Sequence, residues 1–238
     1  MSAFVYGTGL QWKLDFRKQD VLISFYLIPL VMFAVMGGVL SSIMPDMQDA
    51  IIQSMTIFGV SMGAFTGLPP SLVQIYGTDI RNVYKANGIP LSVGVITHFI
   101  SAFIHLFIMS MIIFFVAPLL FDAAHPANLP LYFGSLAMFI ASSLAIGSAL
   151  GVWIKDHAKV SMIAQLFFLP SVMLSGIMMP ADMLPSVFSY IGRAVPATWG
   201  KLLMTSDVFS LGYFVPQLIM FCVATLACAV ALSRNVKA

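Results

Sequence analysis

Charged side chains are what this sequence has least of. Asp, Glu, Lys and Arg together make up 8% of its 238 residues, whereas hydrophobic residues make up 60% and the mean hydropathy is +0.99. A soluble domain usually carries about 25% charged residues, and a single core of this size cannot hide so much apolar surface. The composition therefore excludes an ordinary soluble domain and predicts an integral membrane protein.

Other absences exclude further classes of function. The phosphate-binding pattern GxxxxGK[ST] does not occur, so we expect no ATP hydrolysis by this chain. With a formal charge of +2 and no basic patch, binding of nucleic acid is not expected. The two cysteines, Cys222 and Cys228, lie about 9 Å apart along one predicted helix, which is too far for a disulfide between them, so we predict that they are packing residues.

Six apolar runs are present, each long enough to cross a bilayer with about 20 helical residues. Their approximate bounds are Val21 to Ile43, Ala50 to Ile75, Leu91 to Leu120, Leu131 to Ile154, Val160 to Met179, and Tyr213 to Leu232. None contains Asp, Glu, Lys or Arg. Because lipid offers no hydrogen-bond partner to the backbone, we expect an all-α fold of six transmembrane helices, the first run being a retained anchor.

The basic residues predict the orientation. Nine of the eleven fall in segments on one side of the six spans: Lys13, Arg17, Lys18, Arg81, Lys85, Lys155, Lys159, Arg234 and Lys237. The opposite segments hold only Arg193 and Lys201. Since Lys and Arg accumulate in cytoplasmic loops, both termini are predicted to be cytoplasmic.

Two spans carry more polar residues than the others and are candidates to line an internal pathway. The candidate residues are Gln53, Thr56 and Ser61 in the second span and Gln165, Ser171 and Ser175 in the fifth. Polar groups at membrane depth need partners or water. Hydrogen bonding between helices is the competing interpretation. In the fourth span, Ser143, Gly147 and Gly151 form a small-residue face suited to close helix packing.

The third span carries a polar stripe, because Gly94, His98, Ser101 and His105 share one helical face. The histidines are candidates for a proton relay or a solute contact. A neutral histidine bonded to a neighbouring helix is the plainer alternative, and a metal site is less favoured because the two rings lie about 10 Å apart along the axis.

Two connections have distinctive sequences. In residues 76–90, Thr78 or Asp79 can cap a short helix, Gly88 can end it and Pro90 can start the next span. In the outer region, residues 180–212, prolines interrupt an apolar segment, and short helices that dip into the outer leaflet are expected. For the first of these two connections, residues 76–90, the plain alternative to a short helix with a function is a positively charged cytoplasmic loop.

These features together resemble the type-2 permease family of ATP-binding-cassette (ABC) exporters. The resemblance covers nearly the whole chain, as one transmembrane permease domain over residues 1–238. It rests on a basic segment at residues 1–20, six spans, a GT-containing helix that ends before a proline, and a pattern in the outer region. That pattern consists of Leu174, Ser175, Gly176, Pro180, Leu184, Pro185 and Pro196.

The resemblance implies roles for particular segments. Residues 1–20 would form an interfacial elbow helix, although Leu10, Trp12, Leu14 and Phe16 alternate with polar residues at a strand-like period. Spans two and five would form much of the interface between two permeases. Residues 76–90 would be a coupling helix that contacts an ATPase subunit through Gly77, Thr78, Asp79, Arg81, Tyr84 and Lys85.

The resulting expectation is a permease subunit of an ATP-driven exporter and not an enzyme. It would move an amphiphile such as a drug, lipid or hydrophobic peptide out of the cytoplasm or the inner leaflet. Its expected partners are two ATPase subunits, which hold ATP and Mg, a second permease copy or paralogue, and the bilayer. No cofactor is expected on this chain. The expected location is the inner or plasma membrane of a prokaryote, multi-pass. Two alternatives remain: a gradient-driven carrier that uses His98 and His105, and a non-transporting membrane partner or regulatory protein.

Overall fold

The computed structural model describes residues 3–178 and 185–237. In these ranges the chain folds into helices and their connections, and six of the helical stretches are long and apolar enough to cross a membrane. The spans are Gln19–Ile43, Gln48–Tyr76, Leu91–Phe121, Leu129–Trp153, His157–Leu174 and Leu211–Arg234. The prediction of an all-α protein with six transmembrane helices is confirmed. Pro180 and Leu184 of the outer pattern lie outside the described residues.

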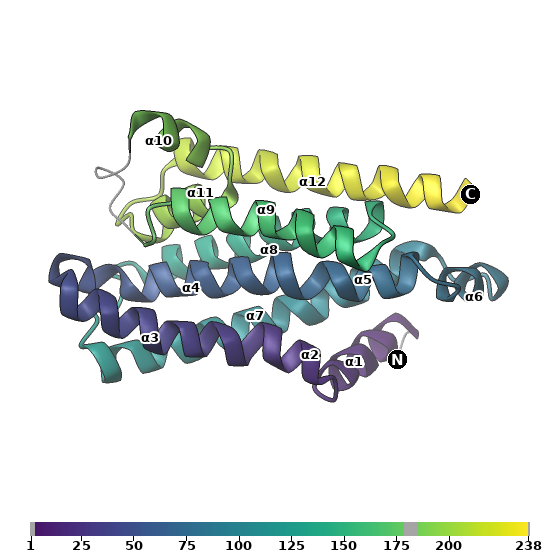
Figure 1. The fold of residues 1–238 in the computed structure, drawn as a ribbon, viewed down its shortest axis with the longest axis horizontal. Helices are drawn as coiled ribbons and strands as arrows, with labels where there is room; N and C mark the ends of the chain where they lie inside the picture. The colour runs from purple at the N-terminus through teal and green to yellow at the C-terminus, as the bar shows by residue number, and fades with distance from the viewer. Residues whose placement is uncertain (1–2, 179–184, 238) are drawn as a thin grey trace.

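The helices follow one another along the chain with short connections (Figure 1). The first span comprises α2 (Gln19–Leu22), the π-helix η1 (Ile23–Leu27) and α3 (Ile28–Ile43), after the leading helix α1 (Ala3–Asp15). The second comprises the 3-10 helix η2 (Pro45–Ala50), α4 (Ile51–Met62), the π-helix η3 (Gly63–Gly67) and α5 (Leu68–Tyr76). After the short helix α6 (Ile80–Ala86) come α7 (Leu91–Phe121), α8 (Leu129–Trp153), α9 (His157–Leu174), α10 (Ser186–Gly192), α11 (Pro196–Met204) and α12 (Leu211–Lys237).

The two termini and α6 lie at one end of the bundle, and α10 and α11 lie at the other (Figure 1). This is the arrangement that six consecutive crossings require. The cytoplasmic assignment of the α6 end remains a prediction from the distribution of Lys and Arg.

The second span is the centre of the bundle. It is buried along almost all of its length, whereas most residues of the first, fifth and sixth spans are not buried. The predicted small-residue face of the fourth span packs directly against it, which confirms that prediction. Gly147 touches the backbone carbonyl of Ala64, and a Cβ atom added to Gly151 would lie 2.8 Å from the carbonyl oxygen of Pro69. Such backbone contact is possible only where the side chain is absent.

The fifth span is shorter than the sequence predicted. Helix α9 ends at Leu174 instead of Met179, because Gly176 adopts a left-handed conformation with φ of +78°. A glycine in that conformation ends a helix without steric cost. Cys222 is exposed and Cys228 is buried in α12, and both are free, so only Cys228 is a packing residue within the chain.

The leading segment is helical, as the resemblance implied and against its strand-like alternation. One face of α1, which includes Asp15 and Trp12, lies against α7, while Leu10 and Leu14 are exposed on the opposite face. In the outer region, the expected short helices are present as α10 and α11. Helix α11 is embedded among α4, α8, α9 and α12, and its Gly200 packs on the ring of Phe139.

Candidate functional site

Helix α6 stands clear of the bundle at the end that holds the termini (Figure 1). None of its seven residues is buried, and the apolar side chains of Ile80 and Val83 are 46% and 57% exposed. Gly88 has a φ of +66° and ends this segment, as predicted, whereas Asp79 occupies the N-cap position without a side-chain capping bond. Helix α6 therefore makes little contact with the rest of the chain and leaves these two apolar side chains on its surface.

The connection from the second span to α6 packs against the segment that follows the fourth span. A Cβ atom added to Gly77 would lie 2.6 Å from the backbone oxygen of Lys155, which follows α8. The neighbouring Thr78 hydroxyl donates a hydrogen bond of 2.6 Å to the carbonyl of Gln74. The start of the α6 segment therefore lies in close contact with the connection between α8 and α9. Of the other predicted coupling residues, Arg81 and Tyr84 are half-buried and Lys85 is exposed.

The candidate pathway residues of the second span are enclosed by helices of the same chain. Gln53, Thr56 and Ser61 are all buried in α4. The Thr56 hydroxyl lies 3.2 Å from the hydroxyl of Tyr132 in α8, which is a hydrogen bond between helices. The Gln53 Oε1 and Ser61 Oγ atoms have no hydrogen-bond partner. Polar atoms without partners inside a bundle are where water or a ligand group can be accommodated.

The candidates of the fifth span do not share one environment. Gln165 is exposed on α9 beside the exposed apolar residues Met162 and Leu166, while Ser171 and Ser175 are buried. The Ser171 hydroxyl donates to the carbonyl of Phe167 in its own helix. The structure therefore does not bring the six candidates to one place: Gln165 faces away from the bundle.

A polar groove near the α6 end contains residues that the sequence did not single out. It has a volume of about 370 Å³ and lies between the first span, the second span and the start of α9. Its polar lining residues are Asp20, Ser24, Thr66, Ser71, Gln74 and His157. These residues come from three separate segments, so only the packing of the spans reveals the groove.

Two π-helical turns face each other beside this groove. In η1, Phe25 is buried and packs onto two glycines of η3. A Cβ atom added to Gly63 would lie 2.8 Å from the Phe25 ring, and one added to Gly67 would lie 3.1 Å from it. Such π-helical turns are rare and occur frequently at functional sites. The available sequence signal was the pair of glycines four residues apart in the second span.

The polar stripe of the third span faces α1 and the first span. Ser101 donates to a carboxylate oxygen of Asp15, and His105 Nδ1 lies 2.8 Å from the hydroxyl of Tyr26. His98 Nδ1 lies 2.9 Å from the carbonyl oxygen of Gly94 in its own helix. The stripe therefore joins helices, as its plainer interpretation held.

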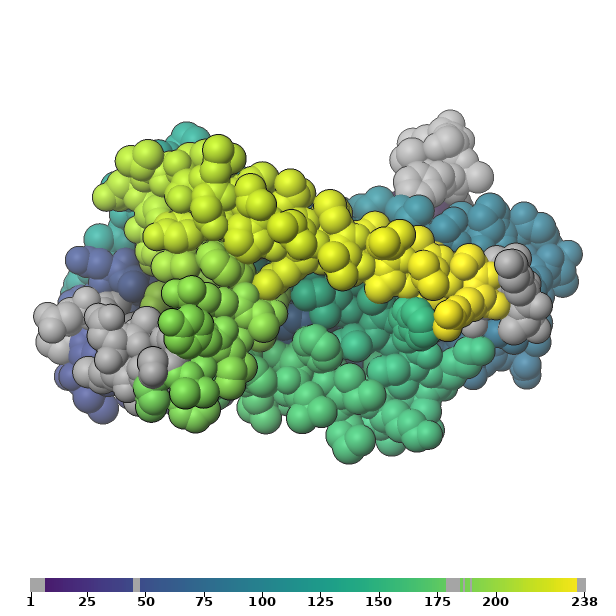
Figure 2. Space-filling model, turned by 90° about the horizontal axis from the view of Figure 1, so that it is seen from above, coloured from purple at the N-terminus to yellow at the C-terminus, as the bar shows by residue number. Residues whose placement is uncertain are grey.

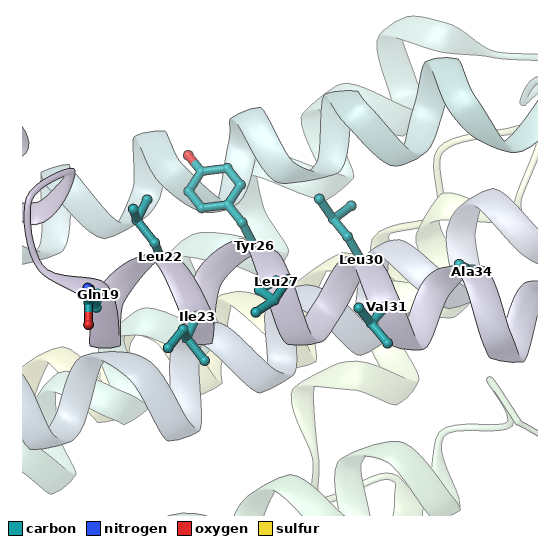
Figure 3. A pocket seen from close by; sticks show the side chains of 8 residues that line it. All are labelled: Gln19, Leu22, Ile23, Tyr26, Leu27, Leu30, Val31 and Ala34. Atoms are coloured by element: carbon teal, nitrogen blue, oxygen red, sulfur yellow. The ribbon is translucent and has the colours of Figure 1, made fainter.

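A long apolar groove of about 630 Å³ follows the outer face of the first span (Figure 3). Its lining includes Ile23, Leu27 and Val31, which are 40%, 58% and 51% exposed. Figure 3 shows their side chains along one side of the helix, while Leu22, Tyr26 and Leu30 project from another side. Figure 2 shows α12 lying across another face of the molecule.

Comparison with known families decides what this bundle is. A family model described as the ABC-2 type transporter matches residues 2–209. The chain belongs to the ABC-2 type transporter family. The match covers α1, the first five spans, α6 and the outer helices, and it ends just before α12. A search of curated proteins finds no match.

Membership of the ABC-2 family and the six apolar helices together establish a multi-pass membrane protein that is the permease component of an ABC transporter. A permease of this family is a transporter and is not itself an enzyme. The resemblance given by the basic leading segment, the GT-containing helix and the outer pattern is thereby confirmed as family membership.

Proposed function

We propose that this ABC-2 permease exports an amphiphilic substrate, such as a drug, lipid or hydrophobic peptide, from the cytoplasm or inner leaflet. Two separate ATPase subunits, which hold ATP and Mg, would supply the energy, and a second permease copy or paralogue would complete the pathway. The observation that carries the proposal is α6, which projects from the bundle with no buried residue and is preceded by Gly77, which packs against the segment that follows the fourth span. A force applied to α6 would reach the spans directly.

The second permease copy is supported by the exposed face of α9. Gln165 is a polar side chain exposed among apolar residues on a membrane span, and such side chains rarely face lipid. A contact with a second chain would give its amide a hydrogen-bond partner. The polar groove between the first, second and fifth spans opens near the same helix, so two copies facing each other would enclose a polar route.

Reversing two charges on α6 tests the coupling. In the variant Arg81→Glu/Lys85→Glu, we expect loss of co-purification with the ATPase and loss of substrate-stimulated ATP hydrolysis. The matched control is Arg17→Glu/Lys18→Glu, which makes the same charge change at exposed residues near the same end. Normal assembly and transport in the α6 variant would contradict the assignment of these two residues.

A gradient-driven carrier is the second candidate, and the buried histidines are its only specific support. His105 Nε2 has no hydrogen-bond partner, and its Nδ1 contacts the hydroxyl of Tyr26. Substrate uptake that follows a proton gradient and disappears in His98→Gln/His105→Gln would favour the carrier. Transport that requires ATP and persists in this variant would favour the exporter. A non-transporting regulatory protein would show neither activity.

A further inference from the structure

A pocket of about 500 Å³ lies at the end of the bundle opposite α6. It is placed where α9 ends and α12 begins, with α11 forming part of its wall. Its lining includes Arg193 and Lys201, the two basic residues that stand apart from the nine on the other side of the spans. No acidic residue lines it within the described part of the chain. The pocket thus has two cations and no counter-charge in its described lining.

The pocket is built to hold Lys201 in place. The ammonium group donates a hydrogen bond to the carbonyl oxygen of Gly176, whose left-handed backbone, with φ of +78°, forms the turn after α9. An ammonium group has three N–H donors, so this contact leaves others for a ligand. Burial lowers the pKa of Lys201 because desolvation disfavours its charge, and a nearby anion would offset that cost.

Arg193 is positioned by the close packing of α10 on α9. A Cβ atom added to the preceding Gly192 would lie 2.5 Å from the carbonyl oxygen of Leu174. The carbonyl of Arg193 itself accepts a hydrogen bond of 2.8 Å from the indole of Trp199. Its guanidinium lies over the ring of Tyr190, 5.3 Å from the centroid. A guanidinium held over a ring still has its five N–H donors, which can bind an anion.

A buried hydroxyl also lines the pocket without a partner. Ser175 is 5% exposed, and its Oγ forms no hydrogen bond to the protein. The wall beside it carries Trp199 and Tyr213, with ring centroids 6.5 Å apart. An unpartnered buried hydroxyl that lines a pocket is available to bond a ligand group or water. Paired Trp and Tyr rings at the ends of spans are typical of the boundary between lipid and water.

We propose that this pocket binds the phosphate group of an anionic membrane lipid, with Arg193 and Lys201 as the recognising cations. Arg is well matched to phosphate oxygens, and a cation held near a membrane surface attracts anionic headgroups. A lipid is favoured over free phosphate by the neighbouring surface of α10, where Val187, Phe188 and Ile191 are 64%, 45% and 49% exposed and could contact acyl chains. The proposal does not depend on which substrate is exported.

Trp199 provides a reporter inside the pocket. The chain has three tryptophans, and Trp12→Phe/Trp153→Phe leaves Trp199 as the only one. The full-length protein would be reconstituted in phosphatidylcholine vesicles that contain either brominated phosphatidylglycerol or brominated phosphatidylcholine. Bromine quenches nearby indole fluorescence, so quenching of Trp199 reports how much of each lipid occupies the pocket. We expect phosphatidylglycerol to bind at least about fivefold more strongly than phosphatidylcholine, which is the contribution of one cation near a membrane surface.

Removing both cations should abolish this preference. Arg193→Gln/Lys201→Met is compared with Arg17→Gln/Lys18→Met, which loses the same two residue types away from the pocket and should keep the preference. The charge-conserving Lys201→Arg should also keep it, and this separates loss of charge from loss of fold. Equal quenching by both lipids, or a preference that persists in Arg193→Gln/Lys201→Met, would overturn the proposal. Reversal of the quenching by inorganic phosphate, at constant ionic strength, would assign the site to free phosphate and overturn the lipid assignment.

Discussion

The Ser101 hydroxyl in the third span donates a hydrogen bond of 2.6 Å to the Asp15 carboxylate at the end of α1. Asp15 is only 6% exposed, and its second oxygen accepts a bond of 2.7 Å from Gln11. A buried carboxylate is stable only when its oxygens are bonded. The leading helix is therefore fastened to the bundle through a specific polar contact, in addition to any contact that it makes with lipid.

Replacing Asp15 should release α1 from α7. In Asp15→Ala, the Ser101 hydroxyl loses its buried partner, and we expect a loss of about 1–3 kcal/mol in stability. Thermal unfolding of the purified protein in detergent measures this. Asp20→Ala removes an equally charged but exposed residue and should change little. If Asp15→Ala/Ser101→Ala is as unstable as the sum of the two single variants, the two groups are not coupled.

Glycine positions in α8 should differ sharply in their tolerance of a methyl group. In Gly147→Ala the new Cβ would meet the backbone of Ala64, which cannot rotate away, so we expect destabilisation of about 1–3 kcal/mol. Gly134→Ala lies in the same helix with nothing within 4 Å of the added atom and should be neutral or stabilising. Unfolding temperatures of the two variants give the comparison, and equal values would mean that η3 and α8 are not in backbone contact.

A methyl group at Gly77 should disturb coupling more than folding. Its Cβ would lie 2.6 Å from the Lys155 oxygen and 2.8 Å from the Val73 oxygen, so the start of the α6 segment must shift. In Gly77→Ala we expect the spans to remain folded while the amount of substrate exported per ATP hydrolysed falls. Gly9→Ala, with nothing within 4 Å, is the control. Unchanged coupling in Gly77→Ala would show that this contact does not transmit motion.

A second permease copy should lie against α9. In the background Cys222→Ser/Cys228→Ser, a cysteine introduced as Gln165→Cys should form a disulfide with the same position of another copy when the membrane is oxidised. Leu226→Cys places the thiol at a residue that is 66% exposed on α12 and should remain monomeric. The readout is a dimer band on a non-reducing gel. Equal dimer formation by both variants would indicate random collision and argue against this interface.

The sequence by itself determined the spans and the ends of some of their connections. Lipid cannot hydrogen-bond the backbone, so each uncharged run of about 20 residues has to be a helix wherever it lies in the bundle. Gly88 ended the α6 segment as predicted, because the left-handed backbone is a local property of glycine. The predicted end of the fifth span was wrong because the prediction followed the apolar residues, which continue past Gly176. The helix itself ends before Gly176, whose backbone is left-handed.

Only the tertiary structure decided which face of each span turns inward. The residues Gln53 and Gln165 looked equivalent in the sequence, yet one is buried in the central helix and the other is exposed on α9. Asp15 and Ser101 are 86 positions apart, and nothing local pairs them. The physical reason is that lipid tails are as apolar as a protein core, so a span can be hydrophobic on every side. Its inward face is then set by close contacts between helices, such as that of Gly147 with Ala64, and those depend on the whole fold.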